Sequence, residues 1–502
     1  MPDPKDDKKT ENGDKKPKAP EEKSVQTRHS VTIDGQEIRY TATAGTSPAQ
    51  RRGRQRQGVG LLRGLHPRRC QGRGQSTTDL LVQRWAGVLF GVDALGHARS
   101  AHRADERRRF RAAAAVQAAR EPALDPRRHR FGLHRSGGDG LQPPAPGEKP
   151  DQFHGYQQDI ESVGEFIRLI TTRLKRWSSP KFLIGESYGT TRAAGLAGHL
   201  MERHGLVFNG VMLISTILNF QTARFTVGND LPNILFLPTY TATAWYHGQL
   251  PAELQERPLR QVLDEVEAFA MGEYTLALMR GDSLPAAGRA DIAAKLARFT
   301  GLDAAYIERT NLRIDIFRFT KELLREQRRT VGRLDSRFIG VDRDAAGEHF
   351  EFDPSYSVIQ GLYTATLNDY VRRDLRFESD LAYEILSGLY QKWDYSNVQN
   401  QFLNVAETLR QALTQNPFMK VYVANGYYDL ATPYFATQYT FNHLQLDEAL
   451  HANISMGYYE AGHMMYVHPP SLAQIKRDLA GFIAQAVTGD AGDPVGSLPV
   501  RG

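Results

Sequence analysis

The sequence predicts an α/β fold in which helices cover a largely parallel sheet, with a mostly helical, lid-like insertion. Three observations predict it. The apolar run Phe182–Ile184 leads through a sharp turn into a helix of small residues. Residues 420–424 form a second apolar strand. Between these strands, residues 219–387 follow a mainly helical pattern. A chain of 502 residues can bury one such core with a large insertion.

The two ends of the chain differ in composition from its middle. Residues 1–24 are lysine, acid and proline with almost no apolar content, which predicts a disordered tail. Residues 25–46 are expected to form an N-terminal hairpin, because they alternate around Asp34-Gly35, a typical hairpin turn. Residues 488–502 contain proline and glycine and are expected to form a loose tail.

Two stretches should form the body of the sheet. Residues 143–218 contain an apolar helical repeat that begins at Ile160, the strand and helix around residue 187, and the strand 210–215. Residues 388–487 contribute the strand 420–424 and a closing helix over residues 472–486. The insertion therefore divides one α/β core rather than joining two domains.

The stretch Gly185-Glu186-Ser187-Tyr188-Gly189 carries the strongest chemical signal. It places a serine between a strand and a helix, in a turn that small residues make possible. Such a serine is a nucleophile when an acid and a histidine follow later in the chain. Asp429 follows the strand 420–424, and His463 lies in a loop after a further strand. His463 would then take the proton of Ser187, and Asp429 would fix the imidazole tautomer.

Each of these residues also has a simpler interpretation. Ser187 fits an ordinary turn, Asp429 fits a helix cap, and His463 fits a surface or core position. The catalytic interpretation is favoured because all three occur in the required chain order, each at the end of a strand.

Three stretches resemble the catalytic blocks of the serine carboxypeptidases, in a bacterial branch: GESYGT, NGYYDLATP and YEAGHMMYVHP. The resemblance runs from about Gln152 to Ile483 and implies an α/β-hydrolase fold. It also implies that Glu186 binds the terminal carboxylate of the substrate. Two acidic groups can meet only if one holds a proton, which agrees with the acidic pH preference of that family. The backbone N–H of Tyr188 is expected to be one oxyanion donor.

The chain departs from that family between residues 47 and 142. The family block Asn-Gly-Gly-Pro-Gly, which supplies the second oxyanion donor, is absent, and so is a block that reads like FIDPVGTGYS. Residues 51–142 contain 20 arginines, no lysine and seven acidic residues. A basic segment of this kind can indicate nucleic-acid binding. That interpretation is disfavoured, because the segment has no lysine and no apolar periodicity.

A one-base shift of the reading frame explains this segment. With suitable codons, the stretch that begins at Val82 reads FNGGPGSSSVWMHLG one base later. The same offset over Arg127–Gln142 permits ADIVLVFIDPVGTGYS, and the start of the segment permits PLKDEGGNARASASFAAYTR. We therefore interpret residues 47–142 as translated out of frame. We expect this segment to be irregular, with the sheet lacking strands beside the nucleophile strand.

The sequence predicts a serine-type carboxypeptidase that acts on peptide or protein C-termini, with no cofactor, metal, nucleic acid or membrane as partner. The alternatives are an esterase or other acyl hydrolase of the same fold, or an inactive frameshifted product. Cys70 is the only cysteine, so no intrachain disulfide forms. The resemblance favours an exported or periplasmic protein, with a cytoplasmic location as the alternative. The sequence leaves localisation, oligomeric state and side-chain preference open.

Overall fold

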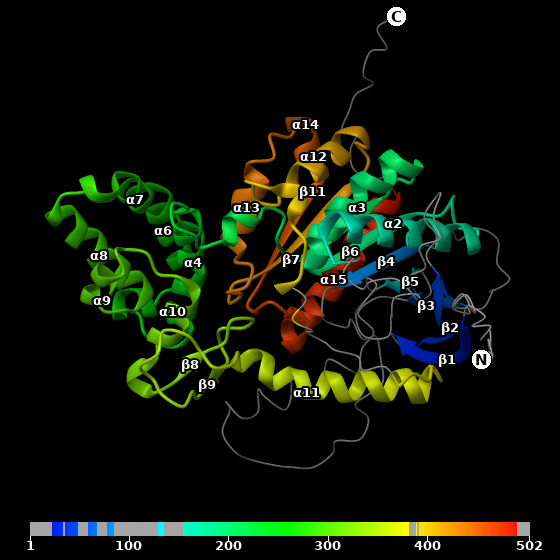
Figure 1. Cartoon of the computed structure of the whole chain (residues 1–502), viewed down its shortest axis with the longest axis horizontal. Coiled ribbons are helices and arrows are strands. Elements are labelled where there is room, and N and C mark those ends of the chain that lie inside the picture. Colours follow the sequence, from blue (N-terminus) through cyan, green and yellow to red (C-terminus); the bar gives the residue numbers. More distant parts are fainter. Residues whose placement is uncertain are drawn as a thin grey trace, which may run out of the picture.

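The computed structural model describes residues 23–33, 36–48, 59–67, 78–84, 129–134, 154–380, 388 and 391–488. The account below concerns these ranges. The predicted disordered tail 1–24 lies outside them up to residue 22, whereas Lys23 and Ser24 open a strand. The predicted loose tail 488–502 lies outside them from residue 489 on, and Thr488 ends a helix. A sheet forms one body of the molecule, and a group of helices lies beside it (Figure 1). Among the described residues, no helix combines the length and apolarity that crossing a membrane needs.

The central sheet has nine strands in the order β1-β2-β3-β5-β4-β6-β7-β10-β11. β1 to β3 and the β3–β5 pair are antiparallel, whereas β5, β4, β6, β7, β10 and β11 run parallel. The strands are β1 Lys23–Ile33, β2 Gln36–Pro48, β3 Val59–Pro67, β4 Thr78–Arg84, β5 His129–His134, β6 Lys181–Ser187, β7 Gly210–Thr216, β10 Lys420–Gly426 and β11 Ile454–Tyr459. This sheet confirms the predicted α/β class.

Three strands lie within residues 47–142, where we predicted irregular structure. β4 pairs with β6, the strand that ends at Ser187, from Asp79↔Lys181 to Arg84↔Glu186. The prediction that the sheet would lack strands beside β6 is therefore wrong. Main-chain N–H and C=O groups need partners whatever side chains they carry, and a strand beside β6 supplies them. The rest of the predicted irregular segment lies outside the described residues.

Helices cover both faces of the parallel strands. Because strand side chains alternate, Leu183 of β6 joins the core beneath α2, α3 and α12, whereas Phe182 and Ile184 join the core beneath α15. The same alternation continues through β7 and β10. The helices are α2 Tyr156–Arg173, α3 Tyr188–His204, α12 Ala406–Gln415, α13 Tyr434–Asn442, α14 Glu448–His451 and α15 Pro469–Thr488.

The insertion forms the helical group beside the sheet in Figure 1. Its core includes Tyr240, which stacks on Phe319 with ring centroids 4.0 Å apart. Its elements are α4 Leu231–Tyr246, α5 Ala252–Gln255, α6 Leu259–Phe269, α7 Thr275–Arg280, α8 Ala286–Thr300, α9 Ala304–Arg309, α10 Ile316–Glu322, β8 Thr330–Val331, β9 Ile339–Gly340 and α11 Pro354–Asp369.

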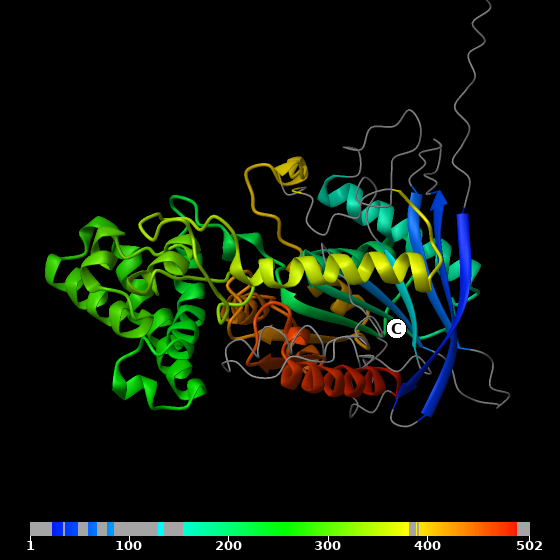
Figure 2. The same cartoon turned by 90° about the horizontal axis from the view of Figure 1, so that it is seen from below.

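α11 joins the insertion to the N-terminal hairpin. Figure 2 shows it running from the helical group to β1 and β2. Near its end, Leu367 and Tyr370 pack with Tyr40 and Ala42 of β2. The hairpin is thereby held by a helix that follows it by more than 300 residues in sequence.

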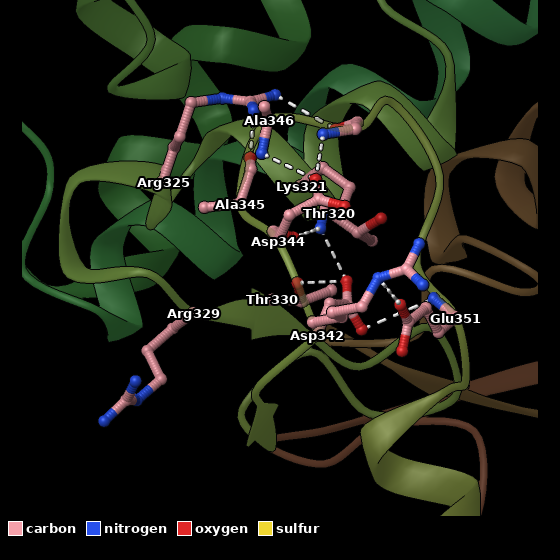
Figure 3. A network of polar contacts seen from close by, with 12 residues as sticks. Thr320, Lys321, Arg325, Arg329, Thr330, Asp342, Asp344, Ala345, Ala346 and Glu351 are labelled. Atoms are coloured by element: carbon pink, nitrogen blue, oxygen red, sulfur yellow. Dashed lines mark hydrogen bonds and ion pairs between the residues drawn. The ribbon is translucent and has the colours of Figure 1, made fainter.

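A buried ion pair anchors the strand β9 and the loop after it (Figure 3). Lys321 Nζ lies 2.6 Å from Asp342 Oδ2 and donates to the carbonyl of Asp344 at 3.0 Å. The Thr330 hydroxyl of β8 also donates to Asp342 Oδ2, at 2.9 Å. A buried charge is tolerated when it is paired and hydrogen-bonded in this way. This network fixes the base of the β8–β9 hairpin to α10.

Candidate active site

Ser187 sits at the strained turn that joins β6 to α3. Its backbone has φ 57° and ψ −127°, which a non-glycine residue adopts only under constraint. The turn is tight, since a Cβ on Gly185 would overlap the carbonyl of Gly189. Ser187 is partly exposed, as a nucleophile at such a turn must be. The structure therefore places Ser187 as the sequence predicted.

Several contacts hold α3 rigidly behind the serine. Arg192 of α3 makes two hydrogen bonds, of 2.7 and 2.8 Å, to the Asp159 carboxylate of α2, and both side chains are fully buried. The Thr191 hydroxyl donates to the carbonyl of Ile217 at 2.6 Å, just after β7. A paired Arg–Asp fork is strongly directional, so the helix that begins after Ser187 is fixed to both its neighbours.

Asp429 lies at the end of β10 and is completely buried. Its Oδ1 accepts the N–H groups of Ala431 and Thr432 at 2.8 and 3.0 Å. Its Oδ2 accepts the Thr432 hydroxyl at 2.7 Å and His463 Nδ1 at 2.8 Å. These four donors satisfy the Asp429 carboxylate, whose burial would otherwise cost free energy.

His463 is buried and held at its ring and its backbone. Its Nδ1 bonds Asp429, which leaves Nε2 as the acceptor nitrogen of the neutral ring. Its N–H donates to Leu334 O at 2.6 Å, and its carbonyl accepts the Ser215 hydroxyl at 2.6 Å. Within the described part of the chain, no hydrogen bond joins His463 to the Ser187 hydroxyl. Such contacts often tighten only when substrate binds.

Glu186 is buried at the end of β6, directly before the serine. The Tyr466 hydroxyl donates to Glu186 Oε1 at 3.2 Å. Because Tyr466 follows His463 by three residues, this contact joins the nucleophile strand to the histidine loop. The structure thus places Glu186 beside both Ser187 and the histidine loop.

Tyr188 is the first residue of α3, so its backbone N–H has no acceptor within the helix. Its ring is buried and packs edge-to-face on Trp393, with centroids 5.3 Å apart. Burial raises the pKa of the Tyr188 hydroxyl well above its usual value of 10. The phenol is therefore held in its neutral form.

Sequence reasoning missed three residues that build the site. Thr432 fixes the Asp429 carboxylate, and the spacing Asp-x-x-Thr is a capping pattern that could have indicated this role. Ser215, which holds the His463 carbonyl, carries no comparable signal. Leu334 comes from the insertion, and its contact with His463 depends on the tertiary fold alone. No group of three or more metal-binding side chains occurs within the described ranges.

Comparisons with known proteins agree on the fold. No family profile and no curated protein sequence matches the chain. Among solved structures, a prohormone-processing carboxypeptidase from Saccharomyces cerevisiae, Kex1Δp, aligns with a TM-score of 0.51 and 11% identity, covering 88% of this chain and 91% of that chain.

Two further solved structures align less closely. A putative aryl esterase from Burkholderia cenocepacia has a TM-score of 0.36 and 10% identity, over 92% of this chain and 99% of that chain. A proline iminopeptidase from Mycobacterium smegmatis has a TM-score of 0.34 and 12% identity, over 89% of this chain and 100% of that chain. Their TM-scores are too low for an argument about this protein.

The chain has the α/β-hydrolase fold, which confirms the fold expected from its catalytic blocks. Ser187 lies at the end of β6, Asp429 follows β10, and His463 follows β11. At 11% identity, the likeness to the yeast carboxypeptidase shows the fold alone.

Proposed function

We propose that the protein is a serine-type carboxypeptidase, which hydrolyses C-terminal peptide bonds through an acyl-enzyme on Ser187. The observation that carries the proposal is the buried 2.8 Å hydrogen bond between Asp429 and His463, in one fold with a serine at a strained turn. An imidazole held in this tautomer can take a proton from a serine hydroxyl.

The proposed reaction has two halves. His463 Nε2 takes the proton from Ser187 Oγ as Oγ attacks the carbonyl carbon, and the backbone N–H of Tyr188 stabilises the oxyanion. The C–N bond then breaks, and His463 returns the proton to the leaving amine. In the second half, His463 takes a proton from water as the hydroxide attacks the ester carbon. The bond between that carbon and Ser187 Oγ then breaks to release the carboxylic acid, and His463 returns the proton to Oγ.

Glu186 supports a carboxypeptidase rather than an esterase. A carboxyl group beside the nucleophile can share one proton with the terminal carboxylate of a peptide, whereas a simple ester offers no such group. The contact between Tyr466 and Glu186 orients this carboxyl group next to the histidine loop. The substrate class is therefore peptides or proteins with free C-termini.

We also propose that residues 47–142 are translated out of frame. Two described strands support it, because each coincides with an apolar stretch of the shifted reading. β4, Thr78–Arg84, corresponds to PTFLFNG, and β5, His129–His134, corresponds to IVLVFI. Buried parallel strands are typically continuous apolar runs of this kind. The printed residues of these strands include Arg84 and Arg130 instead.

The shifted reading also places the missing oxyanion loop near the serine. Its FNGG stretch corresponds to residues 82–85 and so begins within β4. β4 pairs with β6 at Arg84↔Glu186, one residue before Ser187. A glycine-rich loop after β4 would therefore begin at the same sheet edge as the nucleophile, where a second oxyanion donor is needed.

Paired substrates test the proposed activity. The frame-restored chain, in which the one-base shift across residues 47–142 is corrected, should hydrolyse an N-blocked dipeptide. It should act far less on the C-terminal amide of the same dipeptide, because the amide cannot share a proton as a carboxylate does. Equal rates on both, or hydrolysis of simple esters alone, would favour the esterase alternative. No hydrolysis of any substrate by a folded, frame-restored chain would contradict the proposal.

A further inference from the structure

We propose that the Asp335–Arg337 ion pair, which the insertion contributes, is a positioning element for His463. This inference rests on the proposed function. The pair lies in residues 332–338, the loop that joins β8 to β9. Asp335 and Arg337 make two hydrogen bonds, of 2.9 and 2.7 Å, and both side chains are at least 95% buried.

Each member of the pair holds one end of the turn that carries the histidine. Asp335 Oδ2 accepts the N–H of Gly462 at 3.2 Å, directly before His463. Arg337 Nη1 donates to the carbonyl of Glu460 at 2.8 Å. Because the two groups are bound to each other, the turn 460–463 is fixed at both ends by one rigid fork.

The main chain of the same loop also contacts His463 and the residues on either side of Asp429. The N–H of His463 donates to Leu334 O at 2.6 Å. On the acid side, Ser336 donates its N–H to Tyr428 O at 3.0 Å, and Leu430 donates its N–H to the Arg333 carbonyl at 3.1 Å. The residues on both sides of Asp429 are therefore tied to the loop that also holds His463.

The approach between these loops is close enough to require glycine. A Cβ on Gly462 would lie 2.5 Å from both Asp335 Cβ and Leu334 O. The guanidinium of Arg337 also lies 5.2 Å from the centre of the Tyr428 ring, within the range of a cation–π contact. The three loops form one packed unit, in which displacement of Asp335 must displace Gly462.

Other residues of the insertion also contact this loop, at Ser336. On α4, the Thr243 hydroxyl lies 2.6 Å from the Ser336 hydroxyl. Directly after α4, His247 Nε2 lies 2.7 Å from the Ser336 carbonyl. α4 therefore supports the loop, the loop supports the histidine turn, and the insertion sets the geometry of the catalytic pair. This positioning role is distinct from that of the lid that the sequence predicts.

A double substitution with a matched control tests the inference. Asp335→Asn with Arg337→Met removes both charges, so neither is left buried without a partner. The control, Lys321→Met with Asp342→Asn, removes a pair whose side chains are only 2% and 3% exposed. This second pair supports the base of the same hairpin but makes no contact with the residues around His463 in the described ranges.

In the full-length, frame-restored chain, the Asp335/Arg337 variant should lose about 10²-fold in kcat for the blocked dipeptide, because small displacements of reacting groups have effects of that size. KM should stay within about twofold, because ground-state binding is unchanged. The control should keep kcat within about twofold while losing comparable thermal stability. Equal losses of kcat in both variants would show general support of the hairpin and overturn the inference.

Hydrogen exchange gives a readout that needs no activity. Followed by mass spectrometry, the amides of residues 460–463 should exchange faster in the Asp335/Arg337 variant and at the wild-type rate in the control. Unchanged exchange in the first variant would also overturn the inference. If the unsubstituted chain hydrolyses no peptide, the proposed function fails, and the exchange comparison still decides the positioning role.

Discussion

Residues 154–488 and residues 47–142 contribute neighbouring strands to one sheet, yet the strands of the two regions differ in residue composition. In β6, Phe182 and Ile184 enter one core and Leu183 the other, so each residue suits the face it occupies. The described strands β3, β4 and β5 pair along their backbones, but their printed residues include arginines in place of apolar runs. Backbone pairing places a strand, whereas apolar side chains on both faces stabilise it.

The largest loss of activity is expected when the proposed catalytic residues within residues 154–488 are replaced. Ser187→Ala or His463→Ala in the frame-restored chain should each lower kcat by about 10⁶-fold, because the two residues act as a unit. Hydrolysis of a blocked dipeptide measures this loss, and circular dichroism checks that each variant folds. A folded Ser187→Ala variant with more than about a tenth of the activity would remove Ser187 as the nucleophile.

The next largest effect on activity is expected from correcting the frame of residues 47–142. The printed chain should be at least about 10²–10³-fold less active than the frame-restored chain, since losing one oxyanion donor has an effect of that size. Soluble yield should also rise when the frame is restored, because the shifted reading supplies the apolar runs that parallel strands of a central sheet typically have. Assays of both chains at equal concentrations of soluble protein measure the difference. Equal yield and activity would refute the frameshift interpretation.

A smaller effect is expected at Thr432, whose hydroxyl donates to Asp429 at 2.7 Å. Thr432→Val keeps the shape of the side chain and removes this bond to a carboxylate. It should lower the free energy of unfolding by about 1.5–3 kcal/mol, as is typical for hydrogen bonds to charged groups. Urea denaturation measures the change. Thr226→Val, at an exposed threonine far along the chain from Asp429, serves as the control and should change stability by less than about 0.5 kcal/mol.

The smallest effect concerns specificity. Glu186→Gln should lower kcat/KM for the blocked dipeptide by about tenfold more than for the matching ester, because the shared proton contributes roughly 1.4 kcal/mol or more. We also expect the frame-restored chain to prefer low pH on the dipeptide, and we expect Glu186→Gln to weaken that preference while leaving the pH dependence on the ester unchanged. Equal losses on both substrates would assign Glu186 a structural role at the end of β6.

Much of the site was predictable because local sequence sets local geometry. The strand–turn–helix pattern identified Ser187, and chain order identified Asp429 and His463, which the structure joins at 2.8 Å. The positions of Asp335 and Ser215 could not be predicted, since their contacts with the histidine loop span 127 and 248 residues. Contacts over such separations depend on packing that no local pattern encodes.

The fold was predicted less completely than the site. The apolar runs predicted β6, β7 and β10, where residue type and strand face agree. The printed residues around β4 and β5 are rich in arginine, which disfavours strands, so neither strand is predicted from them. The backbone pairing of β6 also determines where its neighbour lies.

The central claim is that Ser187 is a nucleophile whose full activity requires the correct frame in residues 47–142. The most direct test treats both chains with a fluorophosphonate probe and locates the adduct by mass spectrometry. We expect rapid labelling at Ser187 in the frame-restored chain, at least about 10²-fold slower labelling in the printed chain, and none in Ser187→Ala. Labelling at another residue, or equal rates in the two chains, would contradict the account.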